Sequence, residues 1–352
     1  MNDAFARYSC QMPLKGFGKT AQQKLAQAKV LVIGVGGLGC PASLYLVSSG
    51  VGNIGLADDD NVAVKNLHRQ ILYGESDISK SKVKSAEKTL KKLNPKVNIT
   101  RHPRITYENV IQIIKNYDVI VDCSDNFDTR YLLNDACVIE KKPLVYGAIF
   151  QYEGQVAVWN VKNHDNTYSP NYRDIFPSVD DSNIPNCAEG GVLPTIGGII
   201  GCIQASEVIK LITGVGDALK SKMLIFDSFN MNSYSVNLPD RSQVNIEKLT
   251  DNLPKMMSID EFKKIKMDQN YKIIDVRTIK EHQVFNLGGQ NIPLDRIISE
   301  GIALDSSKKT IFYCKAGSRS QKAAKKATIN NPTCEVYSLA GGVDLWLDKH
   351  QG

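Results

Sequence analysis

The chain lacks features that would place it in several other protein classes. It has eight cysteines among its 352 residues but no C-x-x-C pair, so we expect no tetrahedral cysteine site for zinc. The cysteines do not follow the spacing of a disulfide framework, and no apolar segment follows a basic stretch near the N-terminus. We therefore expect reduced thiols, no signal peptide and a cytoplasmic location.

The sequence also has little that suits a membrane or a nucleic acid. Its longest apolar-rich segment, residues 192–213, contains Gln204, Glu207 and Lys210, which predicts a buried or amphipathic helix rather than a membrane span. Basic and aromatic residues are not interleaved as in a nucleic-acid platform. Residues 241–352 hold 18 Lys and Arg against 13 Asp and Glu, which fits either a solvated basic face or a face that attracts an anionic partner.

What the chain does have is a glycine-rich segment early in the sequence. The apolar residues 30–33 run directly into glycines, and Pro41 follows where the first turn of a helix tolerates proline. The glycines are Gly34, Gly36, Gly37 and Gly39. A strand, a tight turn and a helix N-terminus in this order present backbone N–H groups to a phosphate. Asp58 follows a second predicted strand, residues 53–57, at the distance typical of a nucleotide-binding fingerprint.

The remaining pattern predicts two domains. Helices over 79–93 and 126–140 alternate with strands at 118–122 and 144–148, which favours a parallel sheet with covering helices. Residues 153–159 alternate like an antiparallel strand, residues 163–185 resemble a loop, and strands follow near 223–227 and 233–238. We predict a Rossmann-like mixed α/β sheet in residues 1–240, a linker at 241–256, and a small α/β domain at 257–352 with strands at 271–275, 310–313 and 335–338.

Three charged residues suggest what the glycine turn serves. Arg69 in a loop and Lys82 near a helix start could neutralise the charge of a departing pyrophosphate, although each alone would be an ordinary surface cation. Asp125 follows a predicted strand and could hold Mg²⁺ together with nucleotide phosphates. The alternative for Asp125 and Asn126 is a plain helix N-cap.

Two cysteines are candidate reactive thiols. Cys314 ends a predicted strand and opens a loop that leads into a helix at residue 320. The loop consists of Cys314, Lys315, Ala316, Gly317, Ser318 and Arg319. Its backbone N–H groups and the helix dipole favour a thiolate, and Arg319 adds a cation; the alternative is a buried strand-end thiol. Cys187 precedes a Gly-Gly pair and fits a mobile reactive thiol or a packing residue equally well. Cys123 and Cys202 are predicted to be packing residues.

Together these residues resemble a known family, the ubiquitin-activating-type adenylyltransferases of the MoeB/ThiF (HesA/MoeB/ThiF) kind, over about residues 5–238. The resemblance rests on the glycine turn, Asp58 and Asp60, residues 66–70, Lys82, residues 122–126, residues 147–148 with 153–155, and Cys187 with the five residues after it. The C-terminal part is similar to a rhodanese domain through residues 274–277, 281–282, 291–294, 314–319 and 339–342. The fusion resembles enzymes that adenylate and sulfurate a small carrier protein.

The resemblance implies ATP and Mg²⁺ as cofactors. The residues implied to bind the nucleotide are Gly34, Gly36, Gly37, Gly39, Asp58, Asp60, Asn66, Arg69, Lys82, Asp125 and Asn126. Asp125 would also hold the magnesium ion. ATP would activate the C-terminal Gly-Gly carboxylate of a ubiquitin-like sulfur carrier of the MoaD or ThiS type, and a persulfide on Cys314 would convert the adenylate to a thiocarboxylate. Catalytic roles are implied for Cys314, Cys187, Arg69 and Asp125; Cys187 matches a position that forms a covalent carrier link in some relatives and is dispensable in others.

The resemblance further implies a homodimer, with a cysteine desulfurase or thiosulfate as sulfur donor. The product would serve molybdenum cofactor, thiamine or tRNA sulfur chemistry. Many relatives carry two C-x-x-C zinc pairs; here the first would fall at residues 171–174 and the second is absent, so we expect no zinc.

One departure from the family pattern leaves a second function open. The first family motif is Arg-Tyr-x-Arg-Gln, whose second arginine reaches the nucleotide of the neighbouring subunit, and this position is Cys10 here. Turnover would be slower, or Lys15 would substitute. The alternative function is a carrier-binding scaffold with impaired adenylation and only sulfurtransferase activity. A nicotinamide-dependent dehydrogenase fits the glycine turn alone, but it leaves Arg69, Lys82 and Asp125 without a task.

Overall fold

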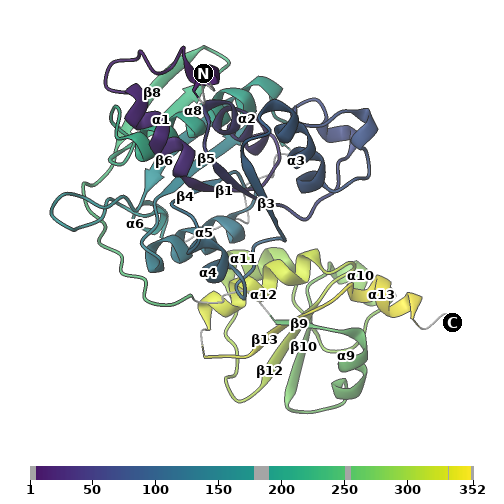
Figure 1. Cartoon of the computed structure of the whole chain (residues 1–352). Helices are drawn as coiled ribbons and strands as arrows, with labels where there is room; N and C mark the ends of the chain where they lie inside the picture. Colours follow the sequence, from purple (N-terminus) through teal and green to yellow (C-terminus); the bar gives the residue numbers. More distant parts are fainter. Residues whose placement is uncertain (1–4, 178–189, 250–254, 332, 350–352) are drawn as a thin grey trace. The chain divides into compact units, whose positions relative to one another are not determined.

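The computed structural model describes residues 5–177, 190–249, 255–331 and 333–349, and the chain divides into two compact units, Met1–Leu249 and Thr250–Gly352. Figure 1 shows the first unit in purple to green and the second in green to yellow. Each unit has its own sheet and its own buried core.

The first unit is built around an eight-stranded mixed sheet in the order β3-β2-β1-β4-β5-β6-β7-β8. Its strands are β1 Lys29–Ile33, β2 Asn53–Ala57, β3 Asn98–His102, β4 Val119–Asp122, β5 Leu144–Phe150, β6 Glu153–Trp159, β7 Lys222–Asp227 and β8 Asn232–Asn237. The strands from β3 to β5 pair in parallel, and those from β5 to β8 pair antiparallel. The predicted mixed α/β sheet is therefore confirmed.

Helices cover both faces of this sheet (Figure 1). They are α1 Gly18–Gln27, α2 Gly39–Ser49, α3 Lys82–Leu93, α4 Val110–Ile114, α5 Phe127–Ile139, α6 Tyr172–Ile175 and α8 Pro194–Thr213. The core on one face is formed with α1, α2, α3 and α8, and the core on the other with α4, α5 and α6. The helix α8 is long and apolar enough to cross a membrane by length and composition alone, but in the structure it packs against α1, α2 and the sheet as a core helix.

The second unit has a five-stranded parallel sheet in the order β11-β10-β12-β13-β9. Its elements are β9 Lys255–Met257, α9 Ile259–Ile265, β10 Tyr271–Asp275, α10 Ile279–Val284, β11 Gln290–Asn291, α11 Leu294–Glu300, β12 Lys309–Tyr313, α12 Ser318–Asn330, β13 Val336–Leu339 and α13 Gly342–Asp348. The helices α11 and α12 contribute to the core on one face of the sheet, and α9 and α13 to the core on the other.

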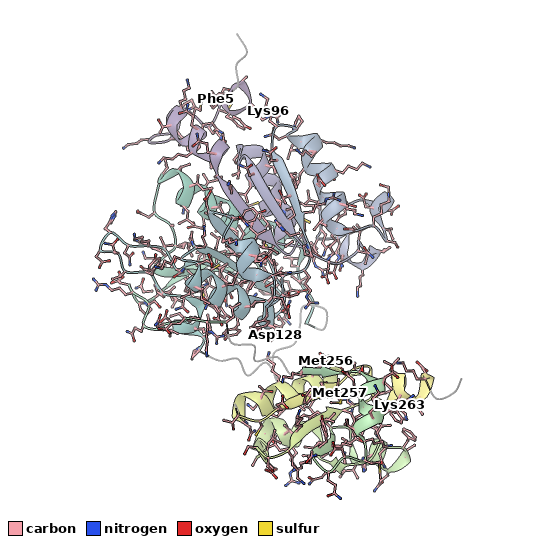
Figure 2. The ribbon with its side chains drawn as sticks, turned by 60° about the horizontal axis from the view of Figure 1, so that its bottom comes forward. Phe5, Lys96, Asp128, Met256, Met257 and Lys263 are labelled. Atoms are coloured by element: carbon pink, nitrogen blue, oxygen red, sulfur yellow. The ribbon has the colours of Figure 1, made fainter. Side chains whose placement is uncertain are left out.

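The structure corrects the sequence-based prediction at four places. Residues 255–256, predicted as linker, begin strand β9, whose Met256 and Met257 are labelled in Figure 2. Met257 is buried and Met256 is exposed. The helix predicted from residue 79 begins at Lys82, because Ser79 has a positive φ and its N–H bonds to Val62 O. Residues 172–175, predicted as loop, form α6. Ser318 and Arg319, predicted as loop, are the first residues of α12, because Gly317 is a left-handed N-cap.

Candidate functional site

The glycine turn joins β1 to α2 and is packed so closely that only glycine fits at two positions. Gly34 has a φ of +85°, and a Cβ built on it would lie 2.6 Å from the Cys123 carbonyl oxygen. A Cβ on Gly39 would lie 1.9 Å from the Gly34 carbonyl oxygen. The turn is thereby folded back on itself and pressed against the segment that follows β4.

The long helix α8 closes on this turn through its own glycines. A Cβ on Gly197 would lie 3.0 Å from the Gly37 carbonyl oxygen, and one on Gly201 would lie 2.5 Å from the Leu38 carbonyl oxygen. The apolar segment that sequence analysis assigned to a buried helix thus forms the support of the turn.

Asp58, at the carboxyl end of β2, fixes the turn by hydrogen bonds. Its Oδ2 accepts from the Val35 N–H at 2.8 Å, and its Oδ1 accepts from the Asp60 N–H at 2.9 Å. Burial raises the pKa of Asp58, and the charge of Lys82 opposes that shift. Lys82, the first residue of α3, is buried and places its Nζ 2.7 Å from Asp60 and 3.9 Å from Asp58. The structure therefore brings Asp58, Asp60 and Lys82 together beside the glycine turn.

Arg69 and Gln70 line the same turn. The Arg69 side chain lies 3.5 Å from the position that a Cβ on Gly37 would take, and its Nη2 donates to Asn66 Oδ1 at 3.2 Å. The Gln70 side chain lies 3.5 Å from the corresponding position at Gly36, and its buried Oε1 has no partner within the described part of the chain. Since an unsatisfied buried amide oxygen is uncommon, this acceptor is suited to a donor on a bound ligand or to a water. Sequence analysis quoted Gln70 in a motif but gave it no role.

Asp125 and Asn126, for which a metal site and a helix N-cap were both considered, differ in their contacts. Asn126 is the N-cap of α5, because its Oδ1 accepts from the Thr129 N–H at 2.9 Å. Asp125 is exposed, and it takes part in no hydrogen bond or ion pair with the residues that the structure describes. Because β4 and β1 are parallel neighbours, Asp125 follows β4 at the sheet edge that carries the glycine turn. Its carboxylate oxygens are therefore available to a hard cation.

A buried ion pair between Asp122 and Arg130 lies at the carboxyl end of β4, and it was not predicted from the sequence. Asp122 is the last residue of β4 and is fully buried, and its Oδ1 accepts from the Ser124 N–H at 2.9 Å. Arg130 on α5 places its Nε 3.4 Å from Asp122 Oδ2, and its guanidinium lies 4.8 Å from the centre of the Tyr146 ring. Burial raises the pKa of the Asp122 carboxyl, and the Arg130 charge opposes that shift. The pair fixes the segment from Asp122 to Asp125 that carries the candidate metal ligand.

Replacing Arg130 by methionine is expected to destabilise the first unit by about 3–5 kcal/mol, because it leaves a buried carboxylate without its partner. Trp159 is buried in the first unit and Trp346 lies in the second, so urea unfolding followed by fluorescence in a Trp346→Phe background reports the first unit. The double variant Asp122→Asn, Arg130→Met should recover part of the loss. An unchanged unfolding midpoint in Arg130→Met would show that the pair is not stabilising.

Two further buried residues hold the site, and sequence analysis gave neither of them a role there. The Tyr73 hydroxyl donates to the Val35 carbonyl oxygen at 2.8 Å, so Val35 is held through its carbonyl by Tyr73 and through its N–H by Asp58. Gln204 on α8 donates from Nε2 to the Asp122 carbonyl oxygen at 2.7 Å and accepts from the Cys123 thiol at 3.5 Å. Cys123 is buried here, as its predicted packing role requires.

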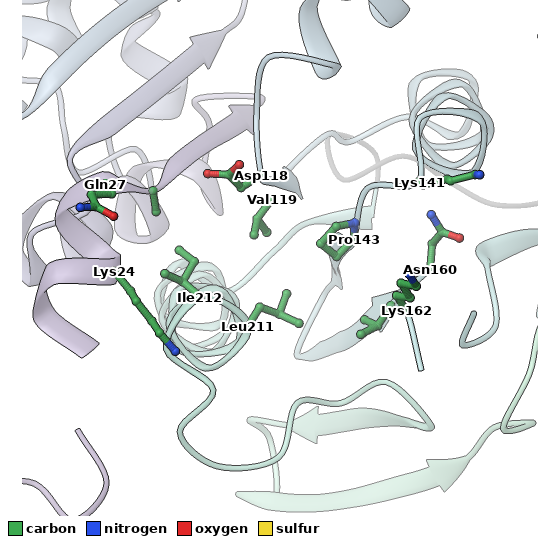
Figure 3. Close-up of a pocket in the computed structure, with 12 residues that line it drawn as sticks. Lys24, Gln27, Asp118, Val119, Lys141, Pro143, Asn160, Lys162, Leu211 and Ile212 are labelled. Atoms are coloured by element: carbon green, nitrogen blue, oxygen red, sulfur yellow. The ribbon is translucent and has the colours of Figure 1, made fainter. Parts of the chain in front are cut away.

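A pocket of about 450 Å³ lies at the other edge of the first sheet (Figure 3). Asp118 and Val119 at the start of β4, Pro143 before β5, and Leu211 and Ile212 of α8 contribute to its lining. Since strands β4 and β5 begin there, the pocket is separated by the length of the strands from the glycine turn. It contains none of the predicted site residues.

The candidate sulfur site lies in the second unit, where β12 ends. Cys314 is buried, and its Sγ accepts from the Gly317 N–H at 3.1 Å. The turn Gly341–Gly342 holds the loop: the Val343 N–H donates to the Cys314 carbonyl oxygen at 2.9 Å, and a Cβ on Gly342 would lie 2.3 Å from that oxygen. Of the predicted backbone N–H groups, the structure shows one, that of the N-cap residue Gly317, donating to the Cys314 thiol before helix α12.

Beside this loop lies a set of paired charges. Asp275, fully buried, binds the Arg277 guanidinium at 2.7 Å and the His282 Nδ1 at 2.8 Å. Arg319 is bound by both carboxylate oxygens of Glu281, at 2.7 and 2.8 Å. Sequence analysis counted Arg319 as a cation next to the thiol, and the structure shows that this cation is paired with Glu281.

The remaining candidates have the following positions. Cys187 lies outside the described residues. Cys10 is exposed, and Cys202 is half-buried in α8. Asp58, Asp59 and Asp60 bring carboxylate oxygens within 4.8 Å of one another, with Lys82 bound to two of them.

Comparison with known proteins agrees with this arrangement. Residues 8–247 match the ThiF family, and residues 258–349 match the rhodanese-like domain. The adenylyltransferase and sulfurtransferase MOCS3 of Drosophila yakuba is 37% identical over 99% of this chain and 84% of that protein. The protein of the same name from Culex quinquefasciatus is 37% identical over 92% of this chain and 82% of that protein.

Solved structures share the fold of the first unit. E. coli MccB bound to ATP has a TM-score of 0.57 at 23% identity, covering 65% of this chain and 69% of that chain. E. coli MccB bound to MccA-N7isoASN has a TM-score of 0.60 at 22% identity, covering 70% and 75%.

These relatives confirm that the chain is an enzyme, with adenylyl transfer and sulfur transfer as its two predicted activities, and they leave no support for a dehydrogenase. By matching residues 8–247 and 258–349 respectively, the chain belongs to the ThiF family and carries a rhodanese-like domain in the same polypeptide.

Proposed function

We propose that the chain uses Mg-ATP to adenylate the C-terminal Gly-Gly carboxylate of a ubiquitin-like sulfur carrier and then replaces the adenylate with sulfur carried on Cys314. A carboxylate oxygen of the carrier would attack the α-phosphorus, and the bond to the departing pyrophosphate would break. The persulfide of Cys314 would then attack the activated carbonyl and release AMP. A second thiol, for which Cys187 is one candidate, would attack the Cys314 sulfur of the resulting acyl disulfide. A disulfide between that thiol and Cys314 would form, and the thiocarboxylate would leave with the electron pair of the broken S–S bond.

The observation that carries this proposal is the grouping of residues at one edge of the first sheet. The glycine turn offers backbone N–H groups, Arg69 offers positive charge, and Lys82 is held beside the turn by Asp58 and Asp60. Asp125 offers a carboxylate that has no hydrogen bond or ion pair with the described residues. This set suits the phosphates of ATP and a hard dication bound to them. Bound magnesium would supply charge neutralisation at the phosphates, while Arg69 and Lys82 would stabilise the charge that develops on pyrophosphate.

Several finer points belong to the same proposal. We expect a homodimer, a cytoplasmic location, no zinc, and either a cysteine desulfurase or thiosulfate as the sulfur donor. The pathway would be molybdenum cofactor, thiamine or tRNA sulfur chemistry. The domain boundary predicted at residues 241–256 would end before β9, so that the rhodanese-like domain includes Lys255 and Met256.

Carrier-dependent exchange of labelled pyrophosphate into ATP tests the adenylation step. We expect exchange with a carrier that ends in Gly-Gly and none with the same carrier shortened by one glycine, because the reacting carboxylate is then displaced by one residue. Exchange should also require Mg²⁺. If the folded chain supports no exchange with any such carrier but still transfers sulfur to cyanide, the scaffold alternative motivated by Cys10 would replace this proposal.

A further inference from the structure

Arg319 is the last residue of the segment 314–319, called the sulfur loop below, and its side chain is bound by an acidic residue from another helix. Arg319 occupies the first turn of α12, five residues after Cys314, and Glu281 belongs to α10, 38 residues earlier in the chain. Both guanidinium Nη atoms are engaged, at 2.8 and 2.7 Å, and each side chain is about one-third exposed. The bidentate geometry is that of a strong, oriented ion pair.

The Glu281 side chain is also held in place by residues other than Arg319. Its Oε2 accepts from the Thr278 N–H at 3.0 Å and from the Thr278 hydroxyl at 2.9 Å. The Glu281 N–H in turn donates to Thr278 Oγ1 at 3.3 Å, which completes the capping box of α10. The Arg319 hydrogen bonds lower the pKa of Glu281 to about 2, so the carboxylate stays charged throughout the physiological range. The pair therefore contributes a fixed negative charge as well as the positive one.

Cys314 is joined to this pair through the start of α12: the N-cap residue Gly317 donates its N–H to Cys314 Sγ at 3.1 Å, and Arg319 is the second residue of the helix. The pKa of Arg319 is raised above its ordinary value chiefly by the Glu281 hydrogen bonds, with smaller contributions from the charges of Cys314 and Asp275. Asp275 is in turn neutralised by Arg277. Lys315 is the cation next to Cys314 that forms no ion pair or hydrogen bond through its side chain within the described residues. The loop thus has a weaker positive field than its sequence suggests.

From this geometry we propose that Glu281 sets the sulfur-donor selectivity of Cys314, by compensating Arg319 and so disfavouring dianionic thiosulfate relative to a cysteine persulfide on a donor protein. The inference rests on the sulfur transfer of the proposed function and names its donor class. Glu281 acts through Arg319 and is a positioning residue.

Both donors deliver the same sulfur by balanced exchange. With thiosulfate, the Cys314 thiolate attacks the outer sulfur, a new S–S bond forms, and sulfite leaves with the electron pair of the broken bond. With a persulfide donor, the thiolate attacks the terminal sulfur and the donor thiolate leaves. Thiosulfate carries two negative charges and the persulfide group at most one, so a nearby carboxylate penalises thiosulfate more.

The test compares Glu281→Gln with the wild-type chain using two donors. Glutamine keeps the size and the capping box of Glu281 and removes its charge. We expect the KM for thiosulfate, measured by thiocyanate formation from cyanide, to fall about tenfold, as removal of one like charge near a dianion predicts. Loading of Cys314 by a cysteine desulfurase supplied with cysteine, measured by mass spectrometry, should stay within about twofold.

Two further variants identify the cause. Glu300→Gln removes the same charge from an exposed pair with Arg296 on α11, and it should leave the KM for thiosulfate unchanged. Adding Arg319→Gln to Glu281→Gln should return the KM to or above the wild-type value, because the freed guanidinium is then lost. A purely structural role for Glu281 would lower the unfolding temperature without lowering this KM.

The outcomes are distinct. A folded Glu281→Gln chain whose KM for thiosulfate is unchanged or higher overturns this inference and leaves the proposed function intact. A wild-type chain that accepts sulfur from neither donor overturns both. A lower KM that persists in the double variant also overturns the inference, since Arg319 would then have no part in the effect.

Discussion

Replacing Cys314 by serine is expected to abolish sulfur transfer and to leave carrier-dependent pyrophosphate exchange at the wild-type level. Serine keeps the shape of the side chain and can accept the Gly317 hydrogen bond, but its oxygen cannot carry a sulfane sulfur. We expect transfer to cyanide and thiocarboxylate formation to fall by about a thousandfold or more. Thiocyanate release and mass spectrometry of the carrier measure the two activities.

A matched control lies in the same unit. Cys334 is a half-buried thiol whose Sγ lies 4.0 Å from the Leu304 carbonyl oxygen, and Cys334→Ser should leave both activities unchanged. Retention of sulfur transfer in Cys314→Ser would move the reactive thiol to another cysteine. Loss of pyrophosphate exchange in that variant, without unfolding, would show that the two activities are not separable.

Several strands could be predicted closely because short apolar runs end at glycine or acidic residues. Strand β3, Asn98–His102, was not predicted, because it is polar and none of its residues is buried. The predicted strands at 53–57 and 271–275 agree with β2 and β10 at both ends. Strand β9 was missed since three residues, Lys255–Met257, carry too little pattern, and they become a strand only by pairing with β13. The start of α3 was placed too early because the left-handed conformation of Ser79 has no signal in a polar, lysine-rich stretch.

The part of the candidate nucleotide site that follows from the order of parallel strands could be predicted from the sequence. Residues that follow parallel strands meet at one sheet edge, so Asp58, Asp125 and the glycine turn could be grouped from the sequence. The supports of that edge could not be grouped, because Tyr73 and Gln204 reach the site from separate segments through tertiary contacts.

The ion pair of Arg319 in the sulfur loop could not be predicted from the sequence, for the same reason. Glu281 and Arg319 are 38 residues apart and on different helices, so the sequence shows a cation near the thiol but not the carboxylate that binds it. The closing of the loop around a buried Cys314 depends on the Gly341–Gly342 turn, where positive φ angles allow a close approach to the Cys314 carbonyl oxygen.

Replacing Asp125 by alanine is expected to reduce pyrophosphate exchange by at least about 100-fold, because a preorganised charge beside the reacting phosphates is lost. Sulfur transfer to cyanide should stay unchanged. The unfolding midpoint of the first unit should also stay close to wild type, because Asp125 is exposed and the capping of α5 is performed by Asn126. Urea unfolding of each variant, alongside the exchange assay, separates a loss of ligand binding from a loss of fold.

Two controls make this result specific to the position of the carboxylate. Asn126→Ala removes the N-cap and should cost about 1 kcal/mol of stability, which Asp125→Ala should not. Asp240→Ala removes an exposed carboxylate that follows β8, at the opposite edge of the sheet from the glycine turn, and should preserve exchange. If higher Mg²⁺ concentrations restore exchange in Asp125→Asn, the carboxylate acts by holding the metal. If Asp125→Ala exchanges pyrophosphate normally, the metal ligand must lie among other residues, of which Asp58, Asp59 and Asp60 form a carboxylate cluster beside Lys82.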